Sequence, residues 1–398
     1  MQAGRNNSLF SIFIILLQVT SACSQDVILS DLTLNIGEKY IFNCDCDFPS
    51  MSMMAEHHNT RLINDTLFFI SFSANRQMMY VCNMATGKLR ELPLIDIAGP
   101  TVRQLYYHNH DSVFFLFEEI DIFNLENKLE HPIADMLLIN GYDGELLDEF
   151  WLRDVPYSYK GELSPLILLT GQHLTMNMIK GDNLLISYDI YKPKPTYDYN
   201  PKLLCSYNLK NHTLKMLNVT TPKEFIGKKY GGFYATQICR MQDGNLLLSF
   251  GRDGSLFKYD FDKDSMFCIY KDASRFFVDT DSATMQKRGK YLNVDFWDVN
   301  YCANMGLYCR EIVVHNFMHY RSKSITEFWD TNFNHVGYCF GNKEYSIPYC
   351  TGDGVLRVFN KNTNQWYKVD SLRSTQRTLS EITNLYFIPL TSKSKKTR

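Results

Sequence analysis

The feature that most restricts the fold of this chain is a short phrase that recurs along it. Each copy begins with a polar turn of Asp, Gly or Asn and continues into a mainly apolar run. The copies read NDTLFFISFS (64–73), HDSVFFLFEE (110–119), GDNLLISYDI (181–190) and DGNLLLSFGR (243–252). Period-two alternation recurs along the chain and helical periodicity is nearly absent, a pattern typical of β-strands. An aromatic content of 14% agrees, because aromatic side chains suit a pleated, half-buried surface.

A second pattern, strand–turn–strand, follows each phrase. The last strands of these hairpins begin near Lys88, Glu145, Thr213, Ser265 and His335, and successive starts lie 52 to 70 residues apart. A strand that leads into the phrase, the phrase itself and the hairpin make four antiparallel strands. Units of this size and content are typical of β-propeller blades. The sequence therefore predicts an all-β, six-bladed β-propeller of four-stranded antiparallel blades.

The sixth blade is the least regular unit of the prediction. Residues 352–362 are expected to form its second strand and residues 382–390 its third, which leaves a fourth strand missing. The unpaired N-terminal segment 27–36 is expected to supply it and to close the ring, because closure removes two exposed sheet edges. A two-domain β-sandwich is the alternative, and an unbroken ring of contacts would decide against it.

The N-terminus has the three-part form of a secretory signal. Arg5 precedes the apolar run 9–19, and small residues follow at 20–23. The run is shorter than the roughly 20 residues that span a bilayer, and a buried helix is the alternative. The Thr-Ser-Ala-Cys end resembles a bacterial lipobox, although Thr20 stands where an aliphatic residue is usual. We expect lipidation of Cys23; ordinary cleavage, with a free or disulfide-bonded cysteine, is the alternative.

Several segments resemble a family of six-bladed β-propeller lipoproteins of unknown function from Gram-negative, Bacteroides-type bacteria. They are LPLIDIAGP (92–100), HDSVFFLF (110–117), INGYDGELL (139–147), YCREIVVHN (308–316) and the Asp-x-Asn-Phe-x-x-x-Gly pattern of DTNFNHVG (330–337). The resemblance covers nearly all of the mature chain, and Cys309 departs from it where an aromatic residue is expected. It implies an exported protein with a propeller fold. The expected organisation is a signal peptide (1–22), one propeller domain (23–390) and a basic tail (391–398).

Ten cysteines remain beside Cys23, and an even number in an exported chain suggests disulfides. Cys302 and Cys309 flank a short hairpin and are the expected pair, with buried free thiols expected for most of the others. No Cys-x-x-Cys pair is present, so zinc-ribbon and thioredoxin-type sites lack support. No metal or cofactor is expected, although His57, His58, His108 and His110 could converge as a metal site if they are not simply polar turns.

Candidate ligand contacts lie on or beside the expected inner strands. They are Arg103, Arg240 and Arg310, with Tyr106 and His108 nearby. An arginine near an axial channel could bind a carboxylate or phosphate bidentately, and an aromatic ring could stack on a sugar or peptide. The alternatives are ion pairs between blades for the arginines and ordinary packing for the aromatic residue.

These features favour a binding or scaffolding module over an enzyme. The expected partners are the membrane, through the lipid anchor, and a glycan, a peptide or an envelope protein. A hydrolase or lyase with its site in the axial funnel is the alternative, and a structural envelope subunit is a third possibility. A net charge of −2 gives no argument for nucleic-acid binding. The expected location is the bacterial cell envelope, on the periplasmic or surface face of the outer membrane.

Overall fold

Antiparallel sheets, formed in order along the chain, make up the protein. The computed structural model describes residues 28–40, 57–73, 76–94, 102–119, 133–150, 156–159, 162–165, 175–187, 202–223, 236–251, 253–271, 292–316, 321–363, 365–378 and 381; at some strand ends it describes the backbone only. Within this part of the chain, no helix is long and apolar enough to cross a bilayer.

Four of the sheets have four strands each, paired in sequence order. The first contains β2 (His57–Ile63), β3 (Thr66–Ser73), β4 (Met78–Asn83) and β5 (Leu89–Pro93), and the second contains β6 (Val102–Asn109), β7 (Ser112–Glu119), β8 (Ile133–Ile139) and β9 (Leu146–Phe150). The third contains β12 (Thr175–Lys180), β13 (Asn183–Ser187), β14 (Leu204–Asn208) and β15 (Thr213–Met216), and the fourth contains β16 (Thr236–Arg240), β17 (Leu246–Phe250), β18 (Asp253–Asp260) and β19 (Ser265–Tyr270). A separate hairpin, β10 (Pro156–Tyr159) with β11 (Glu162–Pro165), was not expected from the sequence.

A larger sheet of eight strands follows, in the order β20-β21-β22-β23-β1-β26-β25-β24. Its members are β20 (Leu292–Cys302), β21 (Leu307–Asn316), β22 (Arg321–Trp329), β23 (His335–Phe340), β24 (Tyr349–Cys350), β25 (Leu356–Asn360), β26 (Gln365–Thr378) and β1 (Ile28–Tyr40). The N-terminal strand β1 pairs antiparallel with β26 along most of its length and meets β23 at a single parallel bridge, Asp31 with Tyr338.

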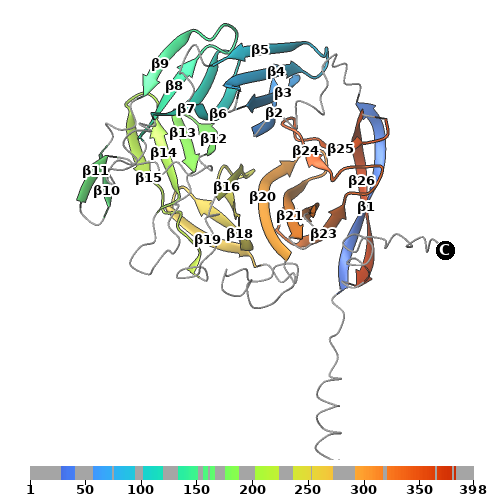
Figure 1. Ribbon diagram of the computed structural model, residues 1–398. Helices are drawn as coiled ribbons and strands as arrows, with labels where there is room; N and C mark the ends of the chain where they lie inside the picture. The colour runs from blue at the N-terminus through green and yellow to red at the C-terminus, as the bar shows by residue number, and fades with distance from the viewer. Residues whose placement is uncertain are drawn as a thin grey trace, which may run out of the picture.

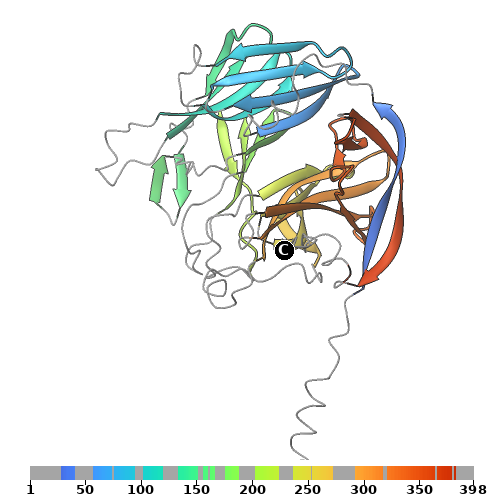
Figure 2. The ribbon, with the colours of Figure 1, turned by 45° about the vertical axis from the view of Figure 1, so that its right-hand side comes forward.

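The sheets are arranged around a common centre, with the first strands β2, β6, β12, β16, β20 and β24 nearest to it (Figure 1). The second view, turned by 45°, shows β1 and β26 crossing one side of the molecule together (Figure 2). First strands of neighbouring sheets contact one another from β2 to β6, β6 to β12, β16 to β20 and β20 to β24. The protein therefore has an all-β, propeller-like fold built from four-stranded antiparallel sheets.

Each copy of the recurrent phrase forms the second strand of a sheet, as the sequence predicts. The copies become β3, β7, β13 and β17. All five residues of β17 are buried, because this strand lies between two paired strands and within packed sheets. The turns before the strands adopt positive φ at Asn64, Asp65, Gly181 and Gly244, which Asn, Asp and Gly tolerate better than other residues.

The predicted starts of the last strands are confirmed to within one residue, since β5, β9, β15, β19 and β23 begin at Leu89, Leu146, Thr213, Ser265 and His335. The expected second strand at 352–362 is confirmed as β25. The expected position of the third strand is corrected: β26 (Gln365–Thr378) pairs with β25, and residues 382–390 lie outside the described residues. Apolar side chains such as Phe150, Leu184, Tyr207 and Leu248 form one continuous core across the second, third and fourth sheets.

Candidate functional site

The carboxyl ends of the first strands carry the chemically distinctive side chains of this protein. Successive sheets repeat one orientation around the centre, so these ends belong to the same end of the ring. Four of them carry a basic residue within or just before the turn into the second strand: Arg61, His108, Lys180 and Arg240. The other two, β20 and β24, end in Cys302 and Cys350. A basic half and a cysteine half therefore share this end.

On the basic half, Arg61 and His108 both contact the ring of Tyr106. The guanidinium carbon of Arg61 lies 4.6 Å from the ring centroid, a cation–π geometry. The Tyr106 hydroxyl lies 3.5 Å from Nδ1 of His108, and the two rings are stacked. Burial, and then the positive charge of Arg61, lower the pKa of His108 below its usual 6.5. At neutral pH His108 is therefore an uncharged donor or acceptor beside a permanent cation.

Lys180 and Arg240 form a second basic pair, where the third and fourth sheets meet. The Lys180 ammonium lies 3.3 Å from the centroid of the Phe261 ring and donates to the Gly244 carbonyl oxygen across 3.2 Å. Burial, followed by the charge of Arg240, lowers the pKa of Lys180, and Asp262 opposes this shift. Arg240 itself is exposed to solvent. No ion pair with a carboxylate is formed by either residue within the described part of the chain.

The structure thus brings Tyr106 and His108 together and places Arg240 beside Lys180. Tyr106 is only 5% exposed and packs in the core, which is the alternative role given to it from the sequence. The role of the others as ligand contacts stays a prediction. Arg103 lies on β6, but its side chain is outside the described residues. Sequence reasoning missed Arg61 and Lys180. Superposing the recurrent turns would have found them, because each stands within three residues before the polar turn of its own copy.

Arg310 lies elsewhere, buried between sheets with none of its side chain exposed. It donates to Ser249 Oγ at 3.1 Å, to the Gly254 carbonyl oxygen at 2.7 Å and to Glu327 Oε2 at 2.7 Å. Its guanidinium also stacks over the rings of Phe296 and Trp329. The ion pair with Glu327 lies within one sheet, because Arg310 on β21 and Glu327 on β22 are directly paired residues. Only the hydrogen bonds to Ser249 and Gly254 cross to the fourth sheet, so Arg310 does not form the ion pair between blades that was the alternative from the sequence.

The cysteine half contains three converging thiols. The Sγ atoms of Cys302, Cys309 and Cys350 all lie within 4.8 Å of one another, and all three residues are buried. Cys302 faces Leu307 and Cys309 faces Asn300 in the β20–β21 register, so the two cysteines are diagonal neighbours on one face. Their sulfur atoms are 3.4 Å apart, in the thiol state. The predicted Cys302–Cys309 disulfide stays a prediction, and it would need the sulfurs to approach to about 2.05 Å.

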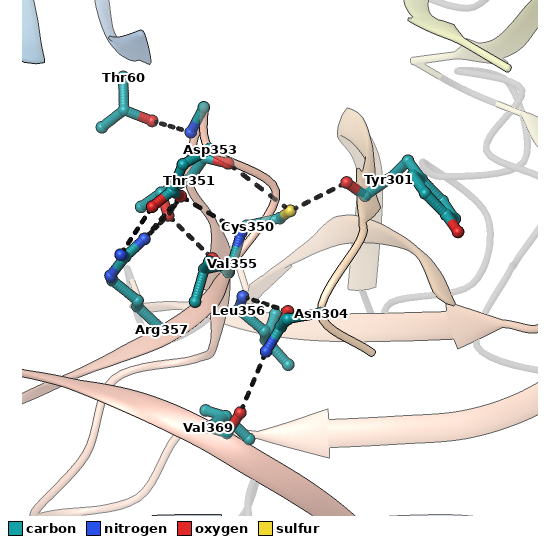
Figure 3. Close-up of polar contacts among 11 residues, drawn as sticks. Thr60, Tyr301, Asn304, Cys350, Thr351, Asp353, Val355, Leu356, Arg357 and Val369 are labelled. Atoms are coloured by element: carbon teal, nitrogen blue, oxygen red, sulfur yellow. Dashed lines mark hydrogen bonds and ion pairs between the residues drawn. The ribbon is translucent and has the colours of Figure 1, made fainter. Parts of the chain in front are cut away.

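The loop after β24 holds Cys350 in place (Figure 3). Cys350 Sγ lies 3.3 Å from the Tyr301 carbonyl oxygen, to which its thiol donates when it is protonated. Beyond it, Arg357 donates to both carboxylate oxygens of Asp353, each at 2.7 Å, and the side chain of Asn304 bridges Leu356 N to the Val369 carbonyl oxygen. The strands β20 and β24, together with the loop held by the Asp353–Arg357 ion pair, therefore position the Cys350 thiol.

The electrostatics of the three thiols favour one shared negative charge. Hydrogen bonds from the thiols of Cys302 and Cys309 lower the pKa of Cys350 to about 5, against the opposing effect of burial. Burial and the interactions with Cys309 and Cys350 raise the pKa of Cys302 well above its usual value. Cys239, on β16, also reaches this segment, since its thiol interacts with the backbone of Tyr301.

No protein-family model and no curated protein sequence matches this chain. One similar solved structure is a Bacteroides fragilis protein that carries the provisional name of an exported protein, with 10% identity, a TM-score of 0.43 and coverage of 89% of this chain and 98% of that one. Another is regucalcin from Agrobacterium tumefaciens, named as a calcium-binding protein, with 10% identity, a TM-score of 0.40 and coverage of 80% and 90%.

A third similar structure is virginiamycin B lyase from Staphylococcus aureus, with 9% identity, a TM-score of 0.37 and coverage of 85% of this chain and 98% of that one. At these values none of the three identifies a ligand or a reaction for this chain. The resemblance to a lipoprotein family stays a prediction, since no family model matches.

Proposed function

We propose that this protein is a six-bladed propeller, anchored to a membrane outside the cytoplasm, that binds ligands bearing an anionic group. The proposal rests mainly on the basic side chains of three first strands, Arg61, Lys180 and Arg240, at one end of the ring, with the uncharged His108 beside Arg61 as a hydrogen-bonding group. The ligand class is an acidic glycan or the acidic segment of a peptide or partner protein.

The count of six blades divides the eight-stranded sheet in two. One blade is β20 to β23, and the other is β24, β25, β26 and β1 in that order. The division is supported by the link between the two halves of the sheet, which is a single bridge between Asp31 and Tyr338. Inside the halves, β1 with β26 and β22 with β23 form antiparallel ladders of several residue pairs. In this arrangement the N-terminal strand completes the last blade. The backbone N–H of Gly352, which donates to Thr60 Oγ1, joins that blade to the first.

An anionic ligand is favoured by charge. Among the described residues, no carboxylate lies within ion-pair distance of Arg61, Lys180 or Arg240, and Asp262 acts on Lys180 only from farther away. Guanidinium groups bind carboxylates and phosphates with two parallel hydrogen bonds.

The groups that surround His108 favour a binding role over a hydrolase or lyase activity. An acid–base pair needs a second ionisable group within hydrogen-bond reach. The groups that act on His108 are the Tyr106 hydroxyl and the Arg61 charge, with no carboxylate among the described contacts. The alternative, an axial-funnel hydrolase or lyase, would require its acid or base from another part of the chain.

The location rests on the N-terminal signal and on Cys23. The test is Cys23→Ala in the full chain expressed in a Gram-negative host, with fractionation of the envelope. We expect the wild type in the membrane fraction and the variant in the soluble extracytoplasmic fraction. A variant that stays membrane-bound would disprove the lipid anchor, whatever the ligand.

The ligand is tested by calorimetry with polygalacturonate and polyglutamate as acidic probes, and with neutral dextran as the uncharged probe. The test variant is Lys180→Gln with Arg240→Gln. The control, Lys210→Gln with Lys263→Gln, removes the same charge from exposed ion pairs on outer turns. We expect at least about tenfold weaker binding of an acidic probe in the test variant alone, which equals about 1.4 kcal/mol. Equal weakening in both variants, or no binding of either acidic probe, would refute the proposal; a shortened polysaccharide product would favour the enzyme instead.

A further inference from the structure

The spacing of the three cysteines on the other half of the ring end matches a set of metal ligands. A thiolate–metal bond of about 2.3 Å places three sulfurs of a planar site about 4.0 Å apart. The Sγ atoms of Cys302, Cys309 and Cys350 lie within 4.8 Å of one another, and the closest pair is at 3.4 Å. Small movements of the side chains alone would equalise these distances around one ion.

The convergence of these cysteines differs from ordinary burial of thiols. Free cysteine often packs as a small apolar residue, and Cys82 and Cys205 are buried in this way, each on its own strand. Cys302, Cys309 and Cys350 instead come from three strands, and the last is separated in sequence from the others by β22 and β23. Apolar neighbours, Leu356 and Val369 among them, surround the cluster and keep it dry.

We propose that Cys302, Cys309 and Cys350 together bind one thiophilic metal ion, with Cu(I) as the ion that fits best. Soft thiolate ligands select Cu(I) and Zn(II) among common metals. Structural zinc almost always takes four ligands, whereas the described residues group three sulfurs and no fourth histidine, cysteine or carboxylate atom. Zinc would need Cys239 to move in as the fourth ligand. Each thiol that binds gives its proton to solvent, and the ion keeps its oxidation state.

The proposed site and the predicted Cys302–Cys309 disulfide exclude each other, because the disulfide removes two of the three ligands. The experiment uses the full chain, reduced and then freed of reductant without oxygen, and titrated with Cu(I) against a competing chelator. The test variant is Cys350→Ser. The matched control is Cys205→Ser, which changes another completely buried cysteine in a distant sheet.

We expect the wild type and Cys205→Ser to retain one Cu(I) per chain, and Cys350→Ser to lose at least tenfold in affinity. X-ray absorption of the loaded wild type should show three sulfur neighbours, a measurement that does not depend on the folding of a variant. Cys239→Ser should leave Cu(I) binding unchanged. The contrary result would be a wild type that binds Zn(II) more tightly than Cu(I), together with a Cys239→Ser variant that no longer binds Zn(II). That result would replace the three-ligand Cu(I) site with a four-ligand zinc site. No retained metal, two sulfur neighbours, or a disulfide that persists after mild reduction would overturn the proposal.

Discussion

The backbone N–H of Gly352 donates a hydrogen bond of 2.7 Å to the side-chain oxygen of Thr60, although 292 positions separate the two residues. Thr60 lies on β2, in the first sheet, and Gly352 lies in the loop between β24 and β25. The contact joins the beginning and the end of the series of sheets at its centre. It packs so closely that a Cβ on Gly352 would collide with the Thr60 carbonyl oxygen.

Substitution of this junction should destabilise the whole domain. Gly352→Ala forces the backbone at residue 352 away from the backbone at Thr60. Overpacking of this kind lowers the free energy of unfolding by about 1–3 kcal/mol. Thr60→Val keeps the shape of the side chain but removes the oxygen that accepts from the Gly352 N–H, which should lower the free energy of unfolding by about 1 kcal/mol. Urea unfolding measures both, with the exposed Thr363→Val as the control that should change nothing. A Gly352→Ala protein as stable as the wild type would show that the junction is not closed in solution.

The ion pair between Arg310 and Glu327 should be costly to break from one side. Both side chains are buried and their charged atoms are 2.7 Å apart. Arg310→Met leaves the buried carboxylate with only the His335 ring, whose Nε2 lies 3.2 Å from Glu327 Oε1, and loss of one partner of a buried ion pair costs about 3–5 kcal/mol of the free energy of unfolding. We expect the double variant Arg310→Met with Glu327→Leu to recover much of this loss, because it removes both charges.

Thermal and urea unfolding of the single and double variants checks this coupling. Arg373→Met, on an exposed part of β26, is the control and should change the unfolding free energy by less than about 0.5 kcal/mol. If the double variant is less stable than Arg310→Met alone, the charge pair is not the source of the loss.

The order of the sheets along the chain could be predicted because the residues that mark each strand and turn lie close together in the sequence. Each second strand combines a turn of Asn, Asp or Gly with a run of apolar residues, and both are legible in one sequence. The strand β26 was misplaced because its sequence, QWYKVDSLRSTQRT, is largely polar, and most of it is exposed or half-buried in the structure. The apolar run at 382–390 offered a stronger strand signal than the true partner of β25.

The candidate sites were harder to predict because their members come from different copies of the repeat. Arg61 and Lys180 are ordinary basic residues when read singly, and only the ring places them at a common end. Cys302 and Cys309 could be paired from a short hairpin, but Cys350 joins them through the neighbouring strand β24, which has only two residues. Contacts between sheets, unlike strands and turns, leave no periodic signal.

Acid should unfold the protein in part through Asp353. Burial by itself raises the pKa of this carboxyl, but hydrogen bonds from Arg357 and Thr351 outweigh it, and the pKa lies below its usual value. A carboxyl with a lowered folded-state pKa stabilises the protein above its unfolded-state pKa of about 3.9, and this contribution is lost as the pH falls toward the lowered value. Asp353→Asn should therefore reduce stability at neutral pH and flatten its dependence on pH below about 4.

Urea unfolding at a series of pH values from neutral to acid measures this slope. Asp182→Asn is a suitable control, because the Asp182 side chain is half exposed and pairs with the exposed Lys210. An Asp353→Asn protein with the same slope as the wild type would mean that the Arg357 pair does not persist in solution.

The pairing of β1 with β26 predicts that the N-terminal strand is part of the cooperative unit. Leu32 is 3% exposed and packs with Val358 and Val369 in the last apolar cluster. Leu32→Ala should therefore cost about 2–5 kcal/mol, the range for removing a buried leucine side chain. Glu38→Ala, on the exposed part of the same strand, is the control and should be nearly neutral. The measurement is urea unfolding followed by tryptophan fluorescence, and Trp366 faces Tyr40 across this pair of strands. If Leu32→Ala changes the free energy of unfolding no more than Glu38→Ala does, β1 is not part of the cooperatively folded sheet.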